Sequence, residues 1–432
     1  MADITPNDAG IMADSDSRSI KNAIEAAEAG KTRIVRIPRL NRRTGENLWI
    51  IDETILLPSD MTVLLDDCHL RMADGVFCNM FRNETMYTPE SLTPEGEQHD
   101  IHIIGRGRAL LDGGVHNGLT EATEQKNGLP DVINNNLILL HNVNHYSLEN
   151  FSSLDQRYWA INQIFCKNGR ISDIRFDVEH YVRNQDGINL RIGCSDIVIE
   201  RISGKTGDDV VALTALPMGS EAAFCVEGCR PDIHDVTIRS VHANTHSTLT
   251  ALRCCDGAAL YRIRIEDIRD TGSPWTPWGV VRLGENNYFK ETPGAMYEIT
   301  VRDVHSLRRG TVFAAGTLTD CHISGIFASG DAMNCVSTYY PDAGYDEETH
   351  CHLAGGASMK NVVIDDLHYD AHAPEKDSGY MCNPELPCIG CAIDLRCMRP
   401  ETDTLENVTV RNVMTNGAEK ILIHPGYTLA IQ

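Results

Sequence analysis

The sequence predicts an all-β fold: a single-stranded right-handed parallel β-helix, or solenoid, with an N-terminal capping helix. Three observations predict it. One strand signature recurs at offsets of 22 to 28 residues, as from Leu148 to Ile171 and on to Ile199. Helical periodicity is confined to one segment near the N-terminus. Each repeat is too short for a strand–helix–strand crossover. We therefore expect one domain over residues 1–432.

The capping helix is expected over about residues 19–29. Apolar side chains recur there at helical spacing, at Ile20, Ala23, Ile24 and Ala27. Serines and aspartates before Ile20 can cap its N-terminus, and Gly30 suits a left-handed position after its last turn. Such a helix would cover the open end of the core, because a bare terminal coil would pair edge to edge with another molecule.

The coils of the solenoid are expected over about residues 33–430. Short strands come first, at 33–37, 48–51, 62–65 and 101–104. Five later repeats share a seven-residue form, at 196–202, 235–241, 262–268, 298–304 and 361–367. Its alternating Ile, Val and Leu residues are expected to fill the interior. Long inserted loops between coils would carry function along one side.

The net charge of the chain limits which classes of molecule it can bind. The chain has 38 Lys and Arg against 61 Asp and Glu, a net charge of −23. Such a protein repels nucleic acid and anionic membranes. No apolar run approaches the ~18 residues that a membrane span needs. We therefore expect neither nucleic acid nor membrane as a partner, and no cofactor.

The N-terminal ten residues have neither a basic start nor an apolar segment, so we expect a cytoplasmic location; a secreted form whose signal has been removed stays open. The 15 cysteines are then expected to be reduced and buried. A zinc site is the alternative at the C-terminal set, Cys382, Cys388, Cys391 and Cys397.

Two acidic motifs are spaced by one coil. Asn184-Gln185-Asp186-Gly187 precedes Gly207-Asp208-Asp209, and Asp186 and Asp208 are 22 residues apart. Because one coil advances the stack by ~4.8 Å, Asp186 is expected beside the Asp208–Asp209 pair. Close carboxylates raise one another's pKa, as a general acid beside a general base requires. Ordinary turn residues and a calcium site are the alternatives.

These two motifs resemble the family 28 glycoside hydrolases, the polygalacturonase-like enzymes of the pectin-degrading β-helix superfamily. The segments 57–63 and 105–113 are also similar to that superfamily. Two family motifs are incomplete: no Gly-His-Gly follows the aspartate pair, and the Arg-x-Lys position keeps Arg253 without the lysine.

The resemblance implies roles for individual residues. Asp208 would protonate the glycosidic oxygen, and Asp186 and Asp209 would activate the attacking water. Inversion would place about 6.5–9.5 Å between acid and base. Arg253 would contact the substrate, with His246 a weaker candidate for the missing histidine. Further substrate contacts are expected from the motif and from neighbouring coils, at Asn184, Arg157, Trp159 and Arg282.

The sequence thus favours a glycoside hydrolase acting on O-glycosidic bonds of plant-wall-type, pectic or related, oligosaccharides or polysaccharides. The missing lysine and the negative charge leave other glycosides open. Two alternatives remain: a polysaccharide lyase or epimerase on the same fold, and a non-catalytic glycan-binding β-helix.

Overall fold

The computed structural model describes residues 3–30, 32–114, 135–218, 221–255, 257–273, 279–284, 291–308, 310–338, 345–346, 351–352, 357–372, 389–398 and 400–431. The chain divides into two units, and each is described by itself. Unit 1 is Met1–Asp208 with Met218–Arg230, and unit 2 is Asp209–Pro217 with Pro231–Gln432. The single domain over 1–432 stays a prediction.

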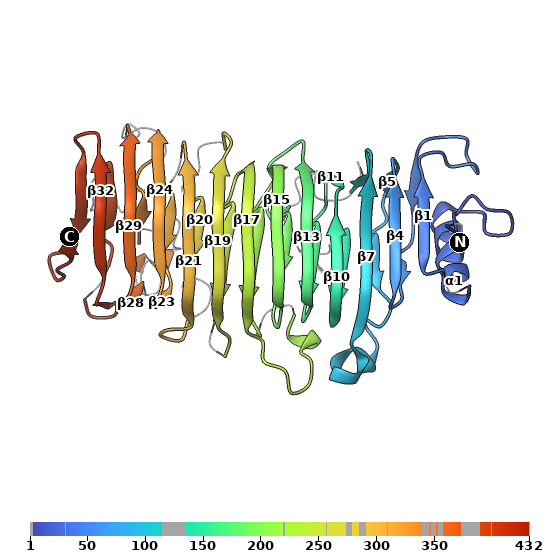
Figure 1. The fold of residues 1–432 in the computed structure, drawn as a ribbon, viewed down its shortest axis with the longest axis horizontal. Helices are drawn as coiled ribbons and strands as arrows, with labels where there is room; N and C mark the ends of the chain where they lie inside the picture. The colour runs from blue at the N-terminus through green and yellow to red at the C-terminus, as the bar shows by residue number, and fades with distance from the viewer. Residues whose placement is uncertain are drawn as a thin grey trace. The chain divides into compact units, whose positions relative to one another are not determined.

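In unit 1, the helix α1 (Asp16–Ala29) begins three residues before the expected start. Tertiary contacts hold this extra turn, because the buried Asp16 carboxylate accepts hydrogen bonds from Asn41 Nδ2 at 2.7 Å and Ile50 N at 2.8 Å. Gly30 ends the helix at φ −82°, so the expected left-handed conformation is wrong. The helix packs on β1 (Ile34–Pro38), β2 (Trp49–Ile51) and β3 (Ile55–Leu57) at the N-terminal end of unit 1 (Figure 1).

Unit 1 is built from three stacks of parallel strands. The first stack runs β1, β4 (Met61–Asp66), β7 (Gln98–Arg106), β10 (Val143–Glu149), β13 (Lys167–Asp177) and β15 (Ser195–Thr206). The second runs β2, β5 (His69–Met72), β8 (Leu110–Asp112) and β11 (Ser152–Leu154), which also pairs with β13. The third runs β3, β6 (Phe81–Asn83), β9 (Ile138–His141), β12 (Ile161–Ile164) and β14 (Ile188–Leu190). Short 3₁₀ helices lie outside these stacks: η1 (Pro89–Leu92), η2 (Pro94–Gly96) and η4 (Ala222–Phe224).

Unit 2 repeats the arrangement. Its first stack runs β17 (Ile233–Thr245), β19 (Leu260–Asp270), β21 (Met296–Ser306), β24 (His322–Gly330), β29 (Val363–Ala371), β32 (Thr409–Thr415) and β34 (Ala430–Ile431). A second stack joins β21 to β23 (Thr317–Thr319), β28 (Ser358–Lys360) and β31 (Leu405–Glu406). The third runs β16 (Val211–Ala215), β18 (Thr250–Cys254), β20 (Val281–Leu283), β22 (Val312–Ala314), β25 (Val336–Ser337), β30 (Cys391–Leu395) and β33 (Glu419–Ile423). A two-stranded antiparallel pair, β26 (Tyr345–Asp346) and β27 (Cys351–His352), completes the described strands. The parallel β-helix predicted from the repeat is confirmed in both units.

The seven-residue signature has a structural cause. Its first and sixth residues adopt left-handed backbone conformations, such as Asp196 at φ 56° and Arg201 at φ 55°. The apolar residues at its second, fourth and seventh positions are buried, as Ile199 and Ile202 show. Asn and Asp tolerate the left-handed region best after glycine, so they recur at these positions.

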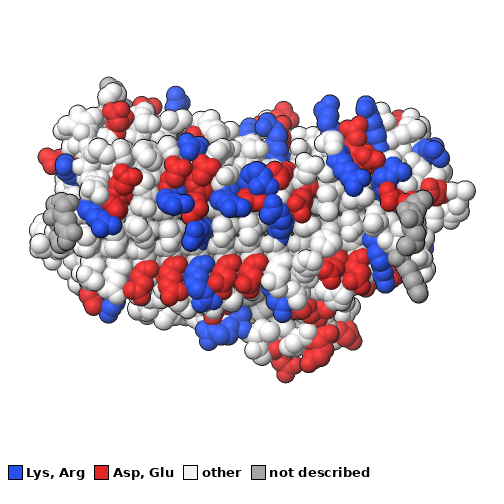
Figure 2. Space-filling model, viewed as in Figure 1, with Lys and Arg blue, Asp and Glu red and all other residues white. Residues whose placement is uncertain are grey.

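The left-handed residues form two rows across each first stack. The first left-handed row is Asp100, His145, Asn168 and Asp196 in unit 1, and Asp235, Arg262, Glu298, Asp320, Asn361 and Asn407 in unit 2. The second is Asn150, Asp173 and Arg201 in unit 1, and Ser240, Asp267, Asp303, Gly325, Asp366 and Asn412 in unit 2. Figure 2 shows acidic and basic side chains gathered in rows on the outer faces of the units.

Several thiols lie in the interior. Cys68, Cys194, Cys321 and Cys335 are buried and free, and burial raises the pKa of each of these thiols to about 12. Cys382 and Cys388 lie outside the described residues, so the C-terminal zinc site stays a prediction. Among the described helices, none combines the length and apolar character of a membrane span.

Candidate active site

In unit 1, the first acidic motif and the first two residues of the second, Gly207 and Asp208, lie on adjacent coils. The backbone N–H groups of Gly207 and Asp208 both donate to the carbonyl oxygen of Gln185, at 3.0 and 3.3 Å. In return, the N–H of Asn184 donates to Asp208 Oδ2 at 2.8 Å. Asn184 adopts the left-handed backbone conformation, with φ 61°. The Asp208 carboxylate is therefore held against the turn that leads into Asp186.

Glycine is required at position 207 for this approach. A Cβ there would lie 2.5 Å from Gln185 Oε1 and 2.6 Å from the carbonyl oxygen of Val182. Real Cβ atoms do not approach backbone oxygen so closely. The glycine of the Gly-Asp-Asp motif thus has a packing cause, and it sets the position of Asp208.

The two carboxyl groups of this coil pair differ in exposure. Asp186 is 5% exposed, and its Oδ2 accepts a hydrogen bond from Asn189 Nδ2 at 3.1 Å. Its carbonyl oxygen accepts from the N–H of Ala160 at 3.0 Å. Asp208 is half-buried, so its carboxyl group is the more accessible to a ligand.

In unit 2, Asp209 is 1% exposed and its carboxylate is surrounded by donors. Oδ1 accepts from Ser247 Oγ at 2.7 Å and from the N–H of Thr248 at 3.2 Å. Oδ2 lies 2.6 Å from Arg253 Nη2 and 3.4 Å from Arg282 Nη2. Two guanidinium groups therefore offset one buried negative charge. Asp209 lies at the centre of a polar cluster formed with Ser247, Thr248, Arg253 and Arg282.

The two arginines of this cluster differ in solvent exposure. Arg282, on β20, has a side chain only 2% exposed, whereas the side chain of Arg253, on β18, is 20% exposed. His246 is exposed and directly precedes Ser247, the residue that donates to Asp209. Of the arginine and histidine residues expected to contact substrate, Arg253 and His246 are thus the accessible ones.

Arg157 differs from its expected place in a cleft. It is 1% exposed, and its guanidinium donates to the carbonyl oxygens of Gly113 at 3.0 Å, of Ala73 at 3.4 Å and of Val76. Burial lowers its pKa to about 10. The side chain joins loops that are far apart in the sequence, so its contacts are structural.

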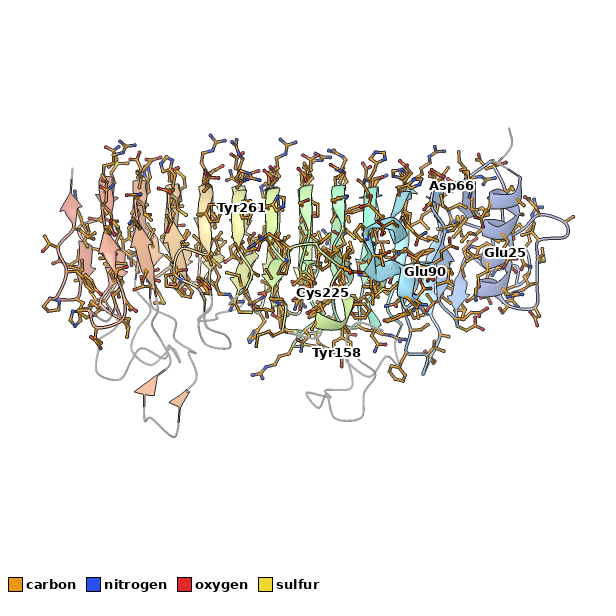
Figure 3. All side chains as sticks on the ribbon, turned by 90° about the horizontal axis from the view of Figure 1, so that it is seen from below. Glu25, Asp66, Glu90, Tyr158, Cys225 and Tyr261 are labelled. Carbon is orange, nitrogen blue, oxygen red and sulfur yellow. The ribbon has the colours of Figure 1, made fainter. Side chains whose placement is uncertain are left out.

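Trp159 is also largely buried, at 8% exposure. The Arg191 guanidinium covers one face of its ring at 4.5 Å. Figure 3 shows the neighbouring Tyr158 at the edge of unit 1 opposite Asp66, a residue of the first stack. One face of the Trp159 ring is therefore occupied by the protein itself.

Sequence reasoning missed the partner that holds Arg191. Glu221 is 0% exposed and forms a two-point ion pair with it, at 2.7 and 3.1 Å. The same inserted segment accepts a hydrogen bond at the Phe224 carbonyl from His141 Nε2 at 2.8 Å. Burial lowers the pKa of His141 to about 4. No local pattern predicts these pairs, because they join an insertion to strands 30 or more residues away.

The comparisons with known proteins agree with this architecture. Residues 96–246 match the family model of glycosyl hydrolases family 28. None of the curated protein sequences matches this one.

Three solved structures share the fold at low identity. Polygalacturonase from Erwinia carotovora has 12% identity and a TM-score of 0.54, with 100% of this chain and 96% of that chain covered. The family 28 exopolygalacturonase of Yersinia enterocolitica has 11% identity and a TM-score of 0.52, with 99% and 78% covered. PfbA, a surface adhesin of Streptococcus pneumoniae, has 13% identity and a TM-score of 0.53, with 100% and 91% covered.

The matched segment, 96–246, contains both acidic motifs. The fold is a right-handed parallel β-helix, as predicted, and this chain resembles a divergent glycosyl hydrolase of family 28, the polygalacturonase-like family.

Proposed function

We propose that this protein is a glycoside hydrolase that cleaves O-glycosidic bonds of pectic or related plant-wall oligosaccharides with inversion. The observation that supports it most is the family 28 match over residues 96–246, which spans Asn184 to Gly187 and Gly207 to Asp209.

In this proposal Asp208 is the general acid. Its carboxyl group is half-buried and oriented by the N–H of Asn184, so it can reach a glycosidic oxygen without free rotation. Asp186 and Asp209 activate the water. Inversion then requires the attacking water to fit between acid and base, with about 6.5–9.5 Å between their carboxyl groups.

The substrate contacts proposed here are Asn184, Arg253 and His246. The Arg253 side chain is 20% exposed, and Asp209 Oδ2 holds its Nη2 at 2.6 Å; an arginine held in this way can offer a planar fork of donors to sugar hydroxyl or carboxylate oxygens. Arg157, Trp159 and Arg282 are each at most 8% exposed, so we propose no direct sugar contact for them.

The experiment is incubation with a panel of pectic and related oligosaccharides, with products identified by mass and by the anomeric configuration of the new reducing end. We expect inverted products from the wild type. Asp208→Asn should reduce the rate by about 10²–10⁴-fold, the usual contribution of a general acid, and leave the melting temperature nearly unchanged.

Asp196→Asn is the matched control for Asp208→Asn. Asp196 is exposed in the same unit, at a left-handed position that asparagine adopts equally well. Full activity in the Asp208 variant would defeat the role assignment. Retained anomeric configuration would defeat inversion, and an unsaturated product absorbing in the ultraviolet would indicate a lyase instead.

A non-catalytic glycan-binding protein is the second candidate. The fold shared with PfbA, a surface adhesin, favours it, as does the burial of Asp209 under side-chain partners. This candidate predicts glycan binding in calorimetry with no new reducing ends after prolonged incubation. Turnover that depends on Asp208 excludes it.

A further inference from the structure

Three imidazoles gather around one carboxylate on the outer face of unit 1. Asp100 Oδ2 lies 2.9 Å from His99 Nδ1, and Asp100 Oδ1 contacts His145 Nδ1. The ring of His102 meets that of His145 edge to face, with centroids 5.4 Å apart. One ligand atom each from Asp100, His102 and His145 lies within 4.8 Å of the others.

The strand register places this group. β7 and β10 pair in parallel, with His99 opposite Asn144 and His102 opposite Ser147. Asp100 at φ 55° and His145 at φ 58° occupy the first left-handed row on neighbouring coils. Because both strands belong to the ladder, the group stands on rigid backbone rather than on a loop.

Histidine–aspartate pairs occur elsewhere on these rows, and they supply a contrast. In unit 2, His242 Nε2 lies 2.9 Å from Asp267, His305 Nε2 lies 2.7 Å from Asp303, and His368 Nε2 lies 2.8 Å from Asp366. Among the described residues, none of these three pairs belongs to a cluster of three or more side chains close enough to bind one metal ion. A surface His–Asp pair is thus ordinary here, and the second and third imidazoles distinguish Asp100.

The donor set selects the ion. Imidazole nitrogen with one carboxylate oxygen suits zinc, whereas calcium and magnesium take oxygen ligands. Zinc needs these ligand atoms about 2.0–2.2 Å from the metal, which modest side-chain rotations can supply. His102 Nδ1 lies 2.9 Å from Ser147 Oγ, a contact that orients the ring and leaves Nε2 for the metal.

We propose that Asp100, His102 and His145 bind a zinc ion that links β7 to β10. Three protein ligands leave the fourth position of a tetrahedral site to water. The site lies on the first stack, apart from the proposed catalytic residues of unit 1, and it does not depend on the proposed hydrolase activity.

The test is titration of the full chain with zinc chloride by isothermal calorimetry, comparing wild type with His102→Ala and His145→Asn. Asparagine keeps the left-handed backbone at position 145 accessible. Each variant should lose one equivalent of bound zinc or bind it at least about tenfold more weakly. The wild type and both variants contain the same cysteines, so any zinc that these bind is the same in every titration. The difference in bound zinc between wild type and variant therefore measures the proposed site.

His305→Asn and His368→Asn are the matched controls, because each removes a single-imidazole pair; both should bind zinc as the wild type does. Ser147→Ala should weaken binding about tenfold while leaving the ligands in place. Zinc should also shift the imidazole proton signals of His102 and His145 in nuclear magnetic resonance spectra. Unchanged zinc binding in folded His145→Asn, or unshifted signals, would overturn the proposal.

Discussion

Two aspartate–arginine pairs of unit 2 have the same chemistry in opposite surroundings. Asp209 and Arg253 meet at 2.6 Å, and the Asp209 side chain is 2% exposed. Asp235 and Arg262 meet at 2.7 and 2.5 Å, and their side chains are 33% and 48% exposed. The first pair lies among buried hydroxyl groups beside β18, and the second stands on the first left-handed row.

The comparison shows that the contact distance of an ion pair does not determine how much the pair contributes to the stability of the fold. Water solvates both partners of the exposed pair, so each gains little from the other. Removing one partner of the buried cluster leaves charge in an interior with few other ways to stabilise it. Burial therefore decides which aspartate the fold depends on.

Asp209→Asn should have the largest effect on stability. We expect a loss of about 3–5 kcal/mol in the free energy of unfolding, because two guanidinium groups lose their shared negative charge. Urea denaturation measures it, with Asp235→Asn as the matched control. Equal losses in the two variants would break the comparison.

His141 extends the comparison to a buried imidazole in unit 1. Burial lowers its pKa to about 4, below the ~6.5 of an unfolded chain. The contribution of neutral His141 to the free energy of unfolding is then fully present above about pH 6.5. It is lost as the pH falls toward 4, a change of about 3 kcal/mol. Stability measured between pH 7 and 4 should fall less steeply in His141→Gln. A His141→Gln variant whose stability falls as steeply as that of the wild type would contradict the assignment.

Asp235→Asn should have the smallest effect, at most about 1 kcal/mol near neutral pH. The Arg262 guanidinium lowers the pKa of Asp235 to about 2, so the contribution is present above about pH 4 and is lost as the pH falls through 2. Added salt should reduce the difference between variant and wild type, which urea denaturation at two ionic strengths checks. A salt-independent loss above 2 kcal/mol would contradict solvent screening.

The coil repeat could be predicted from the sequence because its cause is local. Every full coil needs the same alternation of apolar residues between two left-handed positions, and this pattern is visible at Asp196 to Ile202. The spacing of 22 residues likewise predicts neighbouring coils for Asp186 and Asp208, and Asp208 N bonds Gln185 O.

The surroundings of the site could not be predicted in the same way. Arg157 reaches carbonyl oxygens 44 and more residues away, and Glu221 lies in an insertion with no periodic pattern. Such contacts depend on how irregular segments fold back, which strand periodicity does not encode.

The even spacing of the left-handed residues has an evolutionary consequence. Asp235 and Ser240, Arg262 and Asp267, and Glu298 and Asp303 each stand five positions apart. A duplication or deletion of one whole coil, for example from Asp235 to just before Arg262, would join two chain ends that both have the left-handed backbone conformation. Genes for proteins of this kind can therefore lengthen or shorten by whole turns, whereas a one-residue insertion inside the five-residue interval would turn apolar side chains outward.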